Sequence, residues 1–393
     1  MNTLRPSAPR RLQRGMTLIE LLVAVTIGLV VTLAVTSTLI VGEAQKRSTT
    51  STNDMNQSGN YAAYLLDRVL RSAGSGFSQS WNQGVFGCEL NAARQGTVIL
   101  PRASAFPVPF DGLLDGAGPN NAGDLRVAPV LIGAGQSASG SDVLVVMGGN
   151  AGAGDVPRRI RGSAGAANLL RMDNTVGLAE GDMALVSQSG IEDCLIEQVS
   201  GSPPFADSVN NDVLPLNGTY YTAGPSEATL ATLANGTSAV MNPLGNAAAG
   251  NVQFQMFGVG ANRTLFSYDL LQNGGTDASQ ALSDGVVAMY ARYGLDTNTN
   301  GVLDAWAAPD AAGFDIKSVM KTPATARQIV AVRVALVMRS SIADKTDVTS
   351  EIPIIFSDLA SKINAVPLNG DDRRYRYRVV EFTVPLRNML LLQ

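Results

Sequence analysis

The sequence predicts an α+β fold in which one long N-terminal α-helix packs on a head of antiparallel β-sheet that carries long loop or β insertions. Three observations support this prediction. An uninterrupted apolar block lies near the N-terminus, and a later stretch repeats apolar residues at helical spacing. The remainder of the chain consists of short runs of strand length separated by Gly, Asn, Ser and Asp.

The apolar block follows a short basic segment. Residues 1–15 contain four arginines and no acidic residue, and the chain from Met16 to Val41 is almost wholly apolar. About 20 apolar residues cross a bilayer as a helix, and the basic flank is expected to stay in the cytoplasm. The sequence therefore predicts a single-pass helix in the inner membrane, with residues 77–393 forming a globular head in the periplasm.

Gly15 marks the expected processing point. A conventional signal peptide would have a shorter apolar segment followed by an A-x-A-like site, and neither feature is present. The small residue instead lies between the basic segment and the apolar block. Cleavage after Gly15 would remove residues 1–15 as a leader and leave the helix on a mature chain that begins at Met16.

Glu20 is unusual in the apolar block, because a carboxylate in a membrane helix costs about 2.5 kcal/mol or more near the bilayer centre. It needs a positive partner, and the nearest candidate is the α-amino group that cleavage would create at Met16. In a fibre of packed helices, Glu20 of one subunit would neutralise the amine of a neighbour. The alternative is a carboxylate near the membrane edge that reaches the lipid head groups.

The string RGMTLIELLVAVTIGLVV resembles the class III signal of type IV prepilins, which has a basic leader, a glycine and an apolar helix with Glu as its fifth residue. Gly15, Met16 and Glu20 occupy those positions. The resemblance implies a pilin-like fold, cleavage after Gly15 by the prepilin peptidase, and methylation of the new N-terminus at Met16. Many family members begin the mature chain with Phe, and this chain has Met16 instead.

The helix is predicted to continue beyond the membrane, with residues 16–41 in the membrane or fibre core and residues 42–76 packed on the head. A helix from Met16 to Ala73 would be about 85 Å long. We expect a local break at 48–52 and Gly59, which are poor helix formers, and an end at 74–76. One apolar stripe follows helical spacing: Ala62, Leu65, Leu66, Val69, Leu70 and Ala73.

Strand-length runs dominate the head. The segments between them are rich in Gly, Asn, Ala and Ser and exceed the usual connection length, so they are either surface loops or a small inserted β subdomain. A short helix is predicted over 357–363, with Ser357 as its N-cap. The predicted strands are 142–147, 183–187, 194–200, 252–257, 264–270, 285–295, 329–339 and 377–386, and the long segments are 111–141, 148–168 and 201–250.

Cys88 and Cys194 are the two cysteines of the chain. Their wide spacing suits one disulfide in an oxidising compartment and does not suit a zinc site. A bridge would close a loop of about 100 residues, worth roughly 4–5 kcal/mol in chain entropy. Two unrelated buried thiols are the alternative.

An Asp/Asn-rich segment matches the first half of a calcium loop, in the pattern D-x-N-x-N-G-x-x-D. Ala307 occupies the place of the bidentate Glu of an EF-hand, so only a looser calcium site is expected. The alternative is an Asx-rich turn between two strands. Calcium is the one cofactor that the sequence suggests, and its candidate ligands are Asp296, Asn298, Asn300, the carbonyl of Val302, and Asp304.

The composition excludes several functions. The net charge is −4 and charged residues make up 16%, which argues against a nucleic-acid partner. The chain has no histidine, which excludes a Ser-His-Asp triad, a histidine general base and any histidine-ligated metal. We therefore expect no enzymatic activity.

Segments of the head resemble the PilW family of minor pilins: 373–388, 293–306, 181–194 and the FGC of 86–88. The resemblance implies a minor pilin that primes pilus assembly and takes part in the tip complex, with roles in adhesion and twitching motility. The implied partners are the prepilin peptidase, other minor pilins, the major pilin and a tip adhesin. The chain would lie in the inner membrane before assembly and in the fibre or its tip afterwards.

Two alternatives remain open at this point. A minor pseudopilin of type II secretion would share the N-terminal mechanism. A membrane-anchored periplasmic enzyme would need a fortuitous leader, and the lack of histidine, metal motifs and a nucleophile signature disfavours it.

Overall fold

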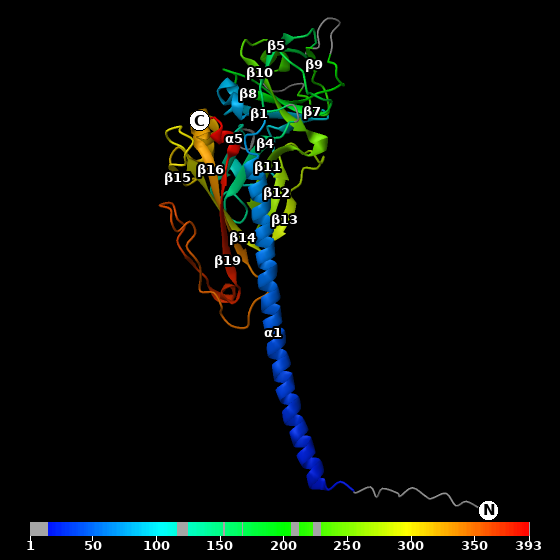
Figure 1. Ribbon diagram of the computed structural model, residues 1–393, viewed down its shortest axis with the longest axis vertical. Helices are drawn as coiled ribbons and strands as arrows, with labels where there is room; N and C mark the ends of the chain where they lie inside the picture. The colour runs from blue at the N-terminus through cyan, green and yellow to red at the C-terminus, as the bar shows by residue number, and fades with distance from the viewer. Residues whose placement is uncertain are drawn as a thin grey trace, which may run out of the picture. The chain divides into compact units, whose positions relative to one another are not determined.

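The computed structural model describes residues 15–115, 125–151, 154–166, 168–205, 212–222 and 229–392 (Figure 1). The chain divides into two compact units, Met1–Asn53 and Asp54–Gln393, and the second unit contains the whole head. A long N-terminal helix and several sheets, mostly antiparallel, make up the fold, so the predicted α+β class is confirmed.

Helix α1 runs without interruption from Leu18 to Arg71, so the expected break at 48–52 and Gly59 was wrong. The hydroxyl of Thr52 donates to the carbonyl of Ser48 at 2.9 Å, which satisfies the side chain inside the helix. A Cβ at Gly59 would lie 3.1 Å from Cγ of Met338 and 3.3 Å from Cγ2 of Val380. Gly59 therefore allows the helix to approach the neighbouring strands closely.

The predicted apolar stripe faces the core of the head. Ala62, Leu66, Leu70 and Ala73 are fully buried, Val69 is buried, and Leu65 is half-buried. After Arg71 the chain turns, with Gly74 and Gly76 at positive φ, a conformation that favours glycine.

Within the described residues the strands form four sheets. The largest has the order β2 (Thr97–Leu100), β1 (Glu89–Arg94), β8 (Asp193–Gln198), β7 (Asp182–Gln188), β10 (Ala239–Asn246), β5 (Arg158–Ser163), β6 (Leu169–Met172), β9 (Val213–Pro215). The second has the order β13 (Gln280–Asp284), β12 (Thr264–Asp269), β11 (Val252–Val259), β4 (Val143–Gly149), β3 (Val130–Gly133).

The third sheet has the order β15 (Ala305–Ala307), β14 (Val286–Leu295), β16 (Ile329–Arg339), β19 (Tyr377–Pro385), and the fourth pairs β17 (Glu351–Ile352) with β18 (Val366–Pro367). β1 and β8 run parallel, whereas the other described pairs are antiparallel. The short helices are α2 (Leu230–Ala234), α3 (Ile316–Lys321), α4 (Pro323–Gln328) and α5 (Arg387–Leu390).

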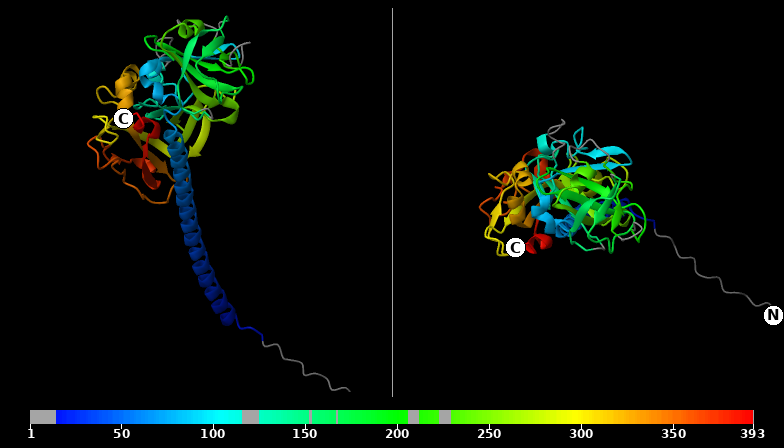
Figure 2. Two further views of the ribbon diagram at one scale, coloured as in Figure 1. Left: turned by 45° about the horizontal axis from the view of Figure 1, so that its top comes forward. Right: turned by 90° about the horizontal axis from the view of Figure 1, so that it is seen from above.

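The part of α1 that belongs to the head lies between the second and third sheets, with β11–β13 on one side and β14, β16 and β19 on the other (Figure 1). The hydroxyl of Ser283 donates to the carbonyl of Ser58 at 3.1 Å, and Ser72 donates to Oε1 of Gln253 at 2.7 Å. The eight-stranded sheet, which is mostly green with β1 and β2 in blue to cyan, lies at the top of the head in Figure 1 (see also Figure 2).

All eight predicted strand runs form strands, namely β4, β7, β8, β11, β12, β14, β16 and β19. Where the long segments are described, they are not plain loops, because β3, β5, β9 and β10 lie in them. For 148–168 and 201–250, the structure therefore favours an inserted β subdomain over surface loops.

The predicted helix over 357–363 was wrong, because this segment forms turns. Ile355 and Ile363 exchange backbone hydrogen bonds at 3.0 and 2.9 Å, which closes the chain between them into a loop. The carboxylate of Asp358 binds Arg333 of β16 at 2.7 Å. These tertiary contacts override the local helical preference.

Candidate functional site

The N-terminal processing segment is extended and exposed where it is described. Gly15, Met16 and Thr17 precede the first turn of α1, and Met16 is 64% exposed. Gly15 does not have a positive φ, and a Cβ added to it would meet no atom within 4 Å. The fold therefore has no need of glycine at this position, and a requirement for it must come from outside the chain.

Thr17 begins the helix in a way that the sequence reasoning missed. Its hydroxyl accepts the backbone N–H of Glu20 at 3.3 Å, so Thr17 and Glu20 stand in the positions of a capping box. The pattern T-x-x-E was the available signal. An acid in the first turn also interacts favourably with the helix dipole. The hydrogen bond with Thr17 uses the backbone of Glu20, so its carboxylate acts locally through the helix dipole, which does not require a second subunit.

The first half of α1 presents an apolar surface. Its large side chains from Leu18 to Val41 are more than half exposed, and the helix is long and apolar enough to cross a membrane. Hydroxyl groups do not interrupt this surface, because they bond back to carbonyls of the preceding turn; Thr26, for example, donates to Val23 at 2.9 Å and Thr36 to Thr32 at 2.7 Å.

Glu20 is the single ionisable residue between Gly15 and Gly42. Among the described residues, its carboxylate has no hydrogen-bond or ion-pair partner. Met16 and Glu20 lie at the exposed start of one helix, and the structure holds one chain. The predicted pairing of Glu20 with an amine concerns a second subunit and stays a prediction.

The two cysteines form a disulfide, in which the Cα atoms of Cys88 and Cys194 are 5.6 Å apart and the sequence separation is 106. Both residues are buried. Cys88 directly precedes β1, and Cys194 lies in β8 opposite Leu90. The bridge thus reinforces the parallel pairing of β1 with β8 in the eight-stranded sheet.

The Asp/Asn loop is organised by its own backbone. Asp296 is fully buried, and its carboxylate accepts the N–H groups of Asn298 at 3.3 Å, Asn300 at 3.2 Å and Gly301 at 2.7 Å. Desolvation alone would raise the pKa of Asp296, but these hydrogen bonds outweigh it and hold the pKa below its ordinary value.

Asp304 is likewise occupied, since one of its oxygens accepts both the N–H and the hydroxyl of Thr297 at 2.9 Å. The side-chain oxygen of Asn300 accepts the N–H of Val302 at 2.8 Å. In the described part of the chain, no group of three or more acidic, histidine or cysteine residues is arranged to hold a metal. The loop has the bonding of an Asx-rich turn.

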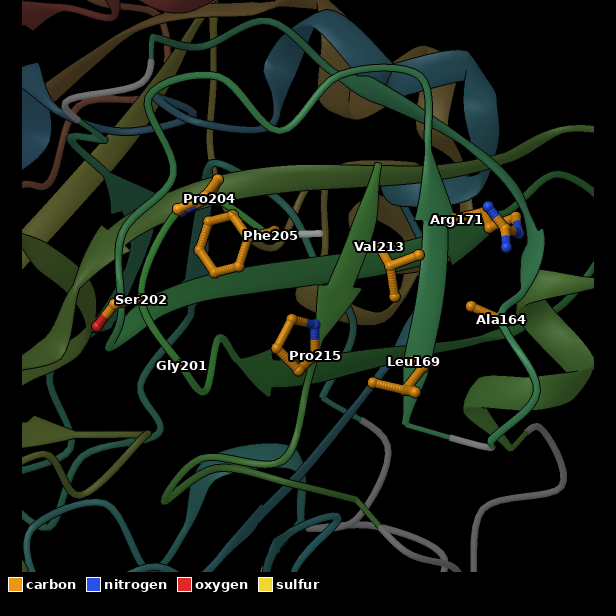
Figure 3. A pocket seen from close by; sticks show the side chains of 9 residues that line it. All are labelled: Ala164, Leu169, Arg171, Gly201, Ser202, Pro204, Phe205, Val213 and Pro215. Atoms are coloured by element: carbon orange, nitrogen blue, oxygen red, sulfur yellow. The ribbon is translucent and has the colours of Figure 1, made fainter. Parts of the chain in front are cut away.

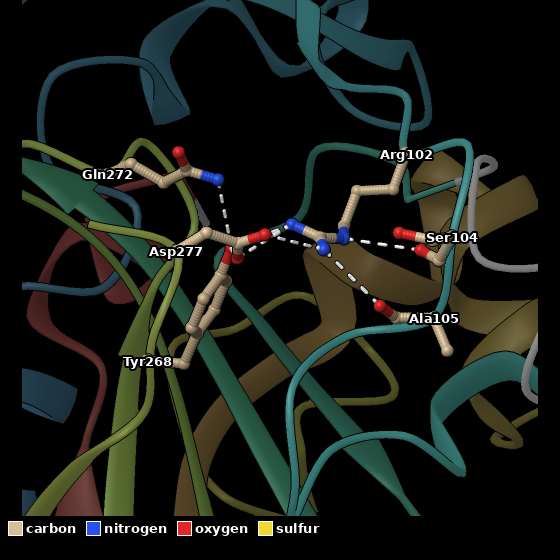
Figure 4. A network of polar contacts seen from close by, with 6 residues as sticks. All are labelled: Arg102, Ser104, Ala105, Tyr268, Gln272 and Asp277. Carbon is tan, nitrogen blue, oxygen red and sulfur yellow. Dashed lines mark hydrogen bonds and ion pairs between the residues drawn. The ribbon is translucent and has the colours of Figure 1, made fainter. Parts of the chain in front are cut away.

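Arg102 organises a polar network that links two loops of the head (Figure 4). Its guanidinium binds both oxygens of Asp277 at 3.0 and 2.9 Å and the hydroxyl of Tyr268 at 2.9 Å. The hydrogen bond from Arg102 lowers the pKa of Asp277, whereas desolvation raises that of Tyr268. This bidentate pair fastens the segment after β2 to the connection between β12 and β13.

Two further acidic side chains are buried in the described part of the head. Desolvation raises the pKa of Glu197 in β8 to about 8, although the backbone N–H of Thr222 donates to its carboxylate at 3.2 Å. Desolvation also raises the pKa of Asp142 to about 6; its carboxylate accepts the N–H groups of Gly135 and Ala291 at 3.0 and 2.9 Å. Both carboxylates accept backbone N–H groups and thereby stabilise the local backbone.

A cavity of about 390 Å³ lies at the β6–β9 edge of the eight-stranded sheet (Figure 3). Leu169, Phe205, Val213 and Pro215 form an apolar lining, and Arg171 lies at one end, ion-paired with Asp212 at 3.2 Å. Among the described residues that line the cavity, none forms an acid–base pair or a metal-ligand set. Arg158 in β5 is buried and donates to the carbonyls of Asn174 and Val176.

Comparison with known families gives two matches. Residues 252–388 match the family described as Type IV Pilus-assembly protein W, and residues 10–36 match the Prokaryotic N-terminal methylation motif. The first match covers β11 to β19, including the whole third sheet, and the second covers Gly15, Met16 and Glu20. The segments 86–88 and 181–194 lie outside both matches. Comparisons with curated proteins and with solved structures gave no match.

Proposed function

We propose that this chain, which is a PilW-type prepilin, acts as a minor pilin that primes assembly of the type IV pilus and takes part in its tip complex. One observation carries the proposal. The part of α1 from Leu18 to Val41 is apolar on all sides and has a single acid as the fifth residue after a glycine that the fold does not need, and residues 252–388 of the same chain match a pilus-assembly family.

The mechanism begins in the inner membrane, where α1 anchors the precursor and the head faces the periplasm. The prepilin peptidase cuts after Gly15 and methylates the amine of Met16. The helix then leaves the lipid and packs against helices of other minor pilins and the major pilin. The hydroxyl groups of this helix already donate to carbonyls of the preceding turn. They therefore need no new partner when the helix moves from lipid into a protein core, so the transfer costs little free energy.

Glu20 sets the register in this proposal by pairing with the N-terminal amine of a neighbouring subunit. The pair forms in a protein core from which water is excluded, where an unpaired carboxylate would be costly. The rival role is the capping box with Thr17, and chemistry separates the two. Glutamine serves at the third position of a capping box as well as glutamate does, but it cannot neutralise an amine.

The Glu20→Gln variant therefore tests the proposal. We expect the variant to insert into the membrane and to be processed normally, but to enter sheared pili poorly, as the Glu20→Ala variant should also do. Immunoblots of membrane and pilus fractions measure both steps. Normal incorporation of Glu20→Gln together with defective Glu20→Ala would assign Glu20 to the helix cap and refute the amine pairing.

Gly15 is tested in the same way. The bulky Gly15→Leu substitution should leave an uncleaved precursor that migrates more slowly on a denaturing gel. Gly28→Leu is a matched control, because Gly28 also has no atom within 4 Å of an added Cβ but lies within α1, away from the cleavage point. Cleavage of Gly15→Leu at the wild-type rate would contradict the proposed processing site.

We propose a structural rather than a catalytic role, with a tip adhesin as the last partner and twitching motility and adhesion as the cellular outcomes. The match of residues 252–388 to a pilus-assembly family favours this role over a minor pseudopilin of type II secretion. Loss of pili on deletion of the gene, with type II secretion unaffected, is the expected result.

A further inference from the structure

β19 forms one edge of the third sheet and is the longest edge strand in the described part of the chain. It spans Tyr377–Pro385 and pairs with β16 on one side without any register shift. The other edge strands, such as β13, β3 and β15, have five residues or fewer. A long regular edge is a template for a further strand.

The hydrogen-bond pattern shows which groups of β19 face outward. Just beyond the two ends of the ladder, the N–H of Ser340 donates to the carbonyl of Arg376, and the N–H of Leu386 donates to that of Val330. Because bonded and non-bonded pairs alternate in an antiparallel ladder, the even-numbered residues of β19 bond to β16. The N–H and C=O groups of the odd-numbered residues therefore point to the open edge: Tyr377, Val379, Glu381 and Thr383.

These outward groups are free within the described residues. Within the described chain, the backbone N–H groups of Tyr377, Val379, Glu381 and Thr383 donate to no other strand, loop or side chain. Pro385, which has no N–H, ends the available ladder. The edge thus offers an alternating series of donors and acceptors that water or a partner must satisfy.

Charged side chains on an edge strand normally discourage pairing with a further strand. The two charged side chains of β19 are instead bound by other residues of this chain. Arg378 donates to Oδ1 of Asn56 at 2.5 Å. Glu381 accepts the N–H of Phe356 at 2.9 Å with one oxygen and binds Arg333 at 2.9 Å with the other. Neither side chain is free to project over the edge and repel a strand.

The apolar side chains of β19 are only partly covered. Val379 on one face and Val380 and Phe382 on the other are half-buried, although residues of β16 beside them are buried. Side chains of an added strand would cover both faces. The chemistry of the occupant follows, since it must be an extended segment with apolar, β-branched or aromatic residues on both sides.

A second copy of this chain is a poor occupant. Two identical edges related by a twofold axis must pair antiparallel, and that axis lies across the strand. β19 and the part of α1 in the head run in the same direction. Asn388 donates to the carbonyl of Ala73 near one end, and Arg378 donates to the side chain of Asn56 near the other. Such a dimer would therefore reverse one α1 relative to its copy, whereas copies anchored in one membrane point the same way.

We propose that β19 is completed by an extended strand from a different protein of the pilus complex, which pairs with the outward groups of Tyr377, Val379, Glu381 and Thr383. This inference rests on the proposed function. It assigns a partner-binding edge to the head, in the mode known as β-augmentation, in which main-chain bonds provide affinity and alternate side chains provide specificity.

The test compares two substitutions at Thr383, which is exposed, in the full chain expressed in its own host. Thr383→Pro removes an outward N–H and places a ring on the open edge without breaking the ladder to β16, since proline is tolerated on edge strands. Thr383→Ala keeps the N–H. Loss of one such bond should lower incorporation into sheared pili at least about fivefold for Thr383→Pro. Thr383→Ala should match the wild type.

A photo-crosslinking amino acid at Thr383 gives a second readout that does not depend on how proline is tolerated. We expect an adduct with another pilus protein, identified by mass spectrometry, and no adduct from the same probe at Val302, which is exposed in a loop. An adduct of two copies of this chain, or equal incorporation of Thr383→Pro and Thr383→Ala, would overturn the inference. Failure of the proposed function is distinct, because deletion of the whole chain would then leave piliation intact.

Discussion

The disulfide between Cys88 and Cys194 should be a major source of head stability. It closes a loop with a sequence separation of 106 residues, and the chain-entropy relation values such a loop at about 5 kcal/mol. Typical domains are stable by only about 5–15 kcal/mol, so the bridge accounts for a large fraction of the total. Both cysteines are buried, and the double Cys88→Ala, Cys194→Ala variant adds at most a small cavity.

The expected loss can be expressed as a melting temperature. At about 2.1 cal/mol/K of unfolding entropy per residue, 5 kcal/mol corresponds to a fall of about 7 °C for a head that extends from Asp54 to Gln393. Circular dichroism of the full chain in detergent, with and without reductant, measures this shift. Each single alanine variant should lose nearly as much as the double variant, because either change removes the whole bridge.

The double alanine variant is its own control, since reductant should not change its melting temperature. If reductant also left the wild-type melting temperature unchanged, or if the effects of the single variants added up in the double variant, the cross-link could not be the cause of the stability. The loop-entropy reasoning would then be refuted.

Three further changes test other parts of the head. Gly148→Ala should lower the free energy of unfolding of the head, measured by chemical denaturation, by about 2 kcal/mol, because the new Cβ would lie 2.3 Å from the carbonyl oxygen of Ser72. Gly274→Ala, whose added Cβ would meet no atom within 4 Å, should leave that free energy unchanged. The head should become less stable as pH rises from 4.5 to 8, because buried Glu197 binds its proton more tightly when folded; a Glu197→Gln variant with the same pH profile would contradict this. Millimolar calcium should leave the melting temperature unchanged, because the 296–304 loop satisfies its own oxygens; a rise on addition, reversed by chelator, would establish a calcium site.

Local signals predicted the N-terminal segment and much of the head. Gly15, the apolar helix and Glu20 are close together in sequence. Strands such as β14 and β16 are long, mostly apolar runs, and this pattern by itself indicates a buried strand. These features depend on neighbouring residues only. The predicted disulfide, in contrast, needed the compartment as an argument, which the apolar helix provided.

Strands that depend on distant partners were missed. β10 contains Asn242, Pro243 and Gly245, a composition that argues against a strand, yet it pairs with β7 across a register shift between Pro243 and Gly245. The close approach of α1 to β16 and β19 explains Gly59, which looked like a helix breaker. Both depend on contacts that no window of the sequence contains.

The chain threads back and forth between the first two sheets. It builds β1 and β2 in the eight-stranded sheet, crosses to build β3 and β4 in the second, returns for β5 to β10, and crosses again for β11. β4 therefore has to wait for β11, which is synthesised about 100 residues later, before the two can pair. A head interleaved in this way is expected to fold as a unit, so neither the segment that matches the pilus-assembly family nor the rest should fold when it is expressed alone.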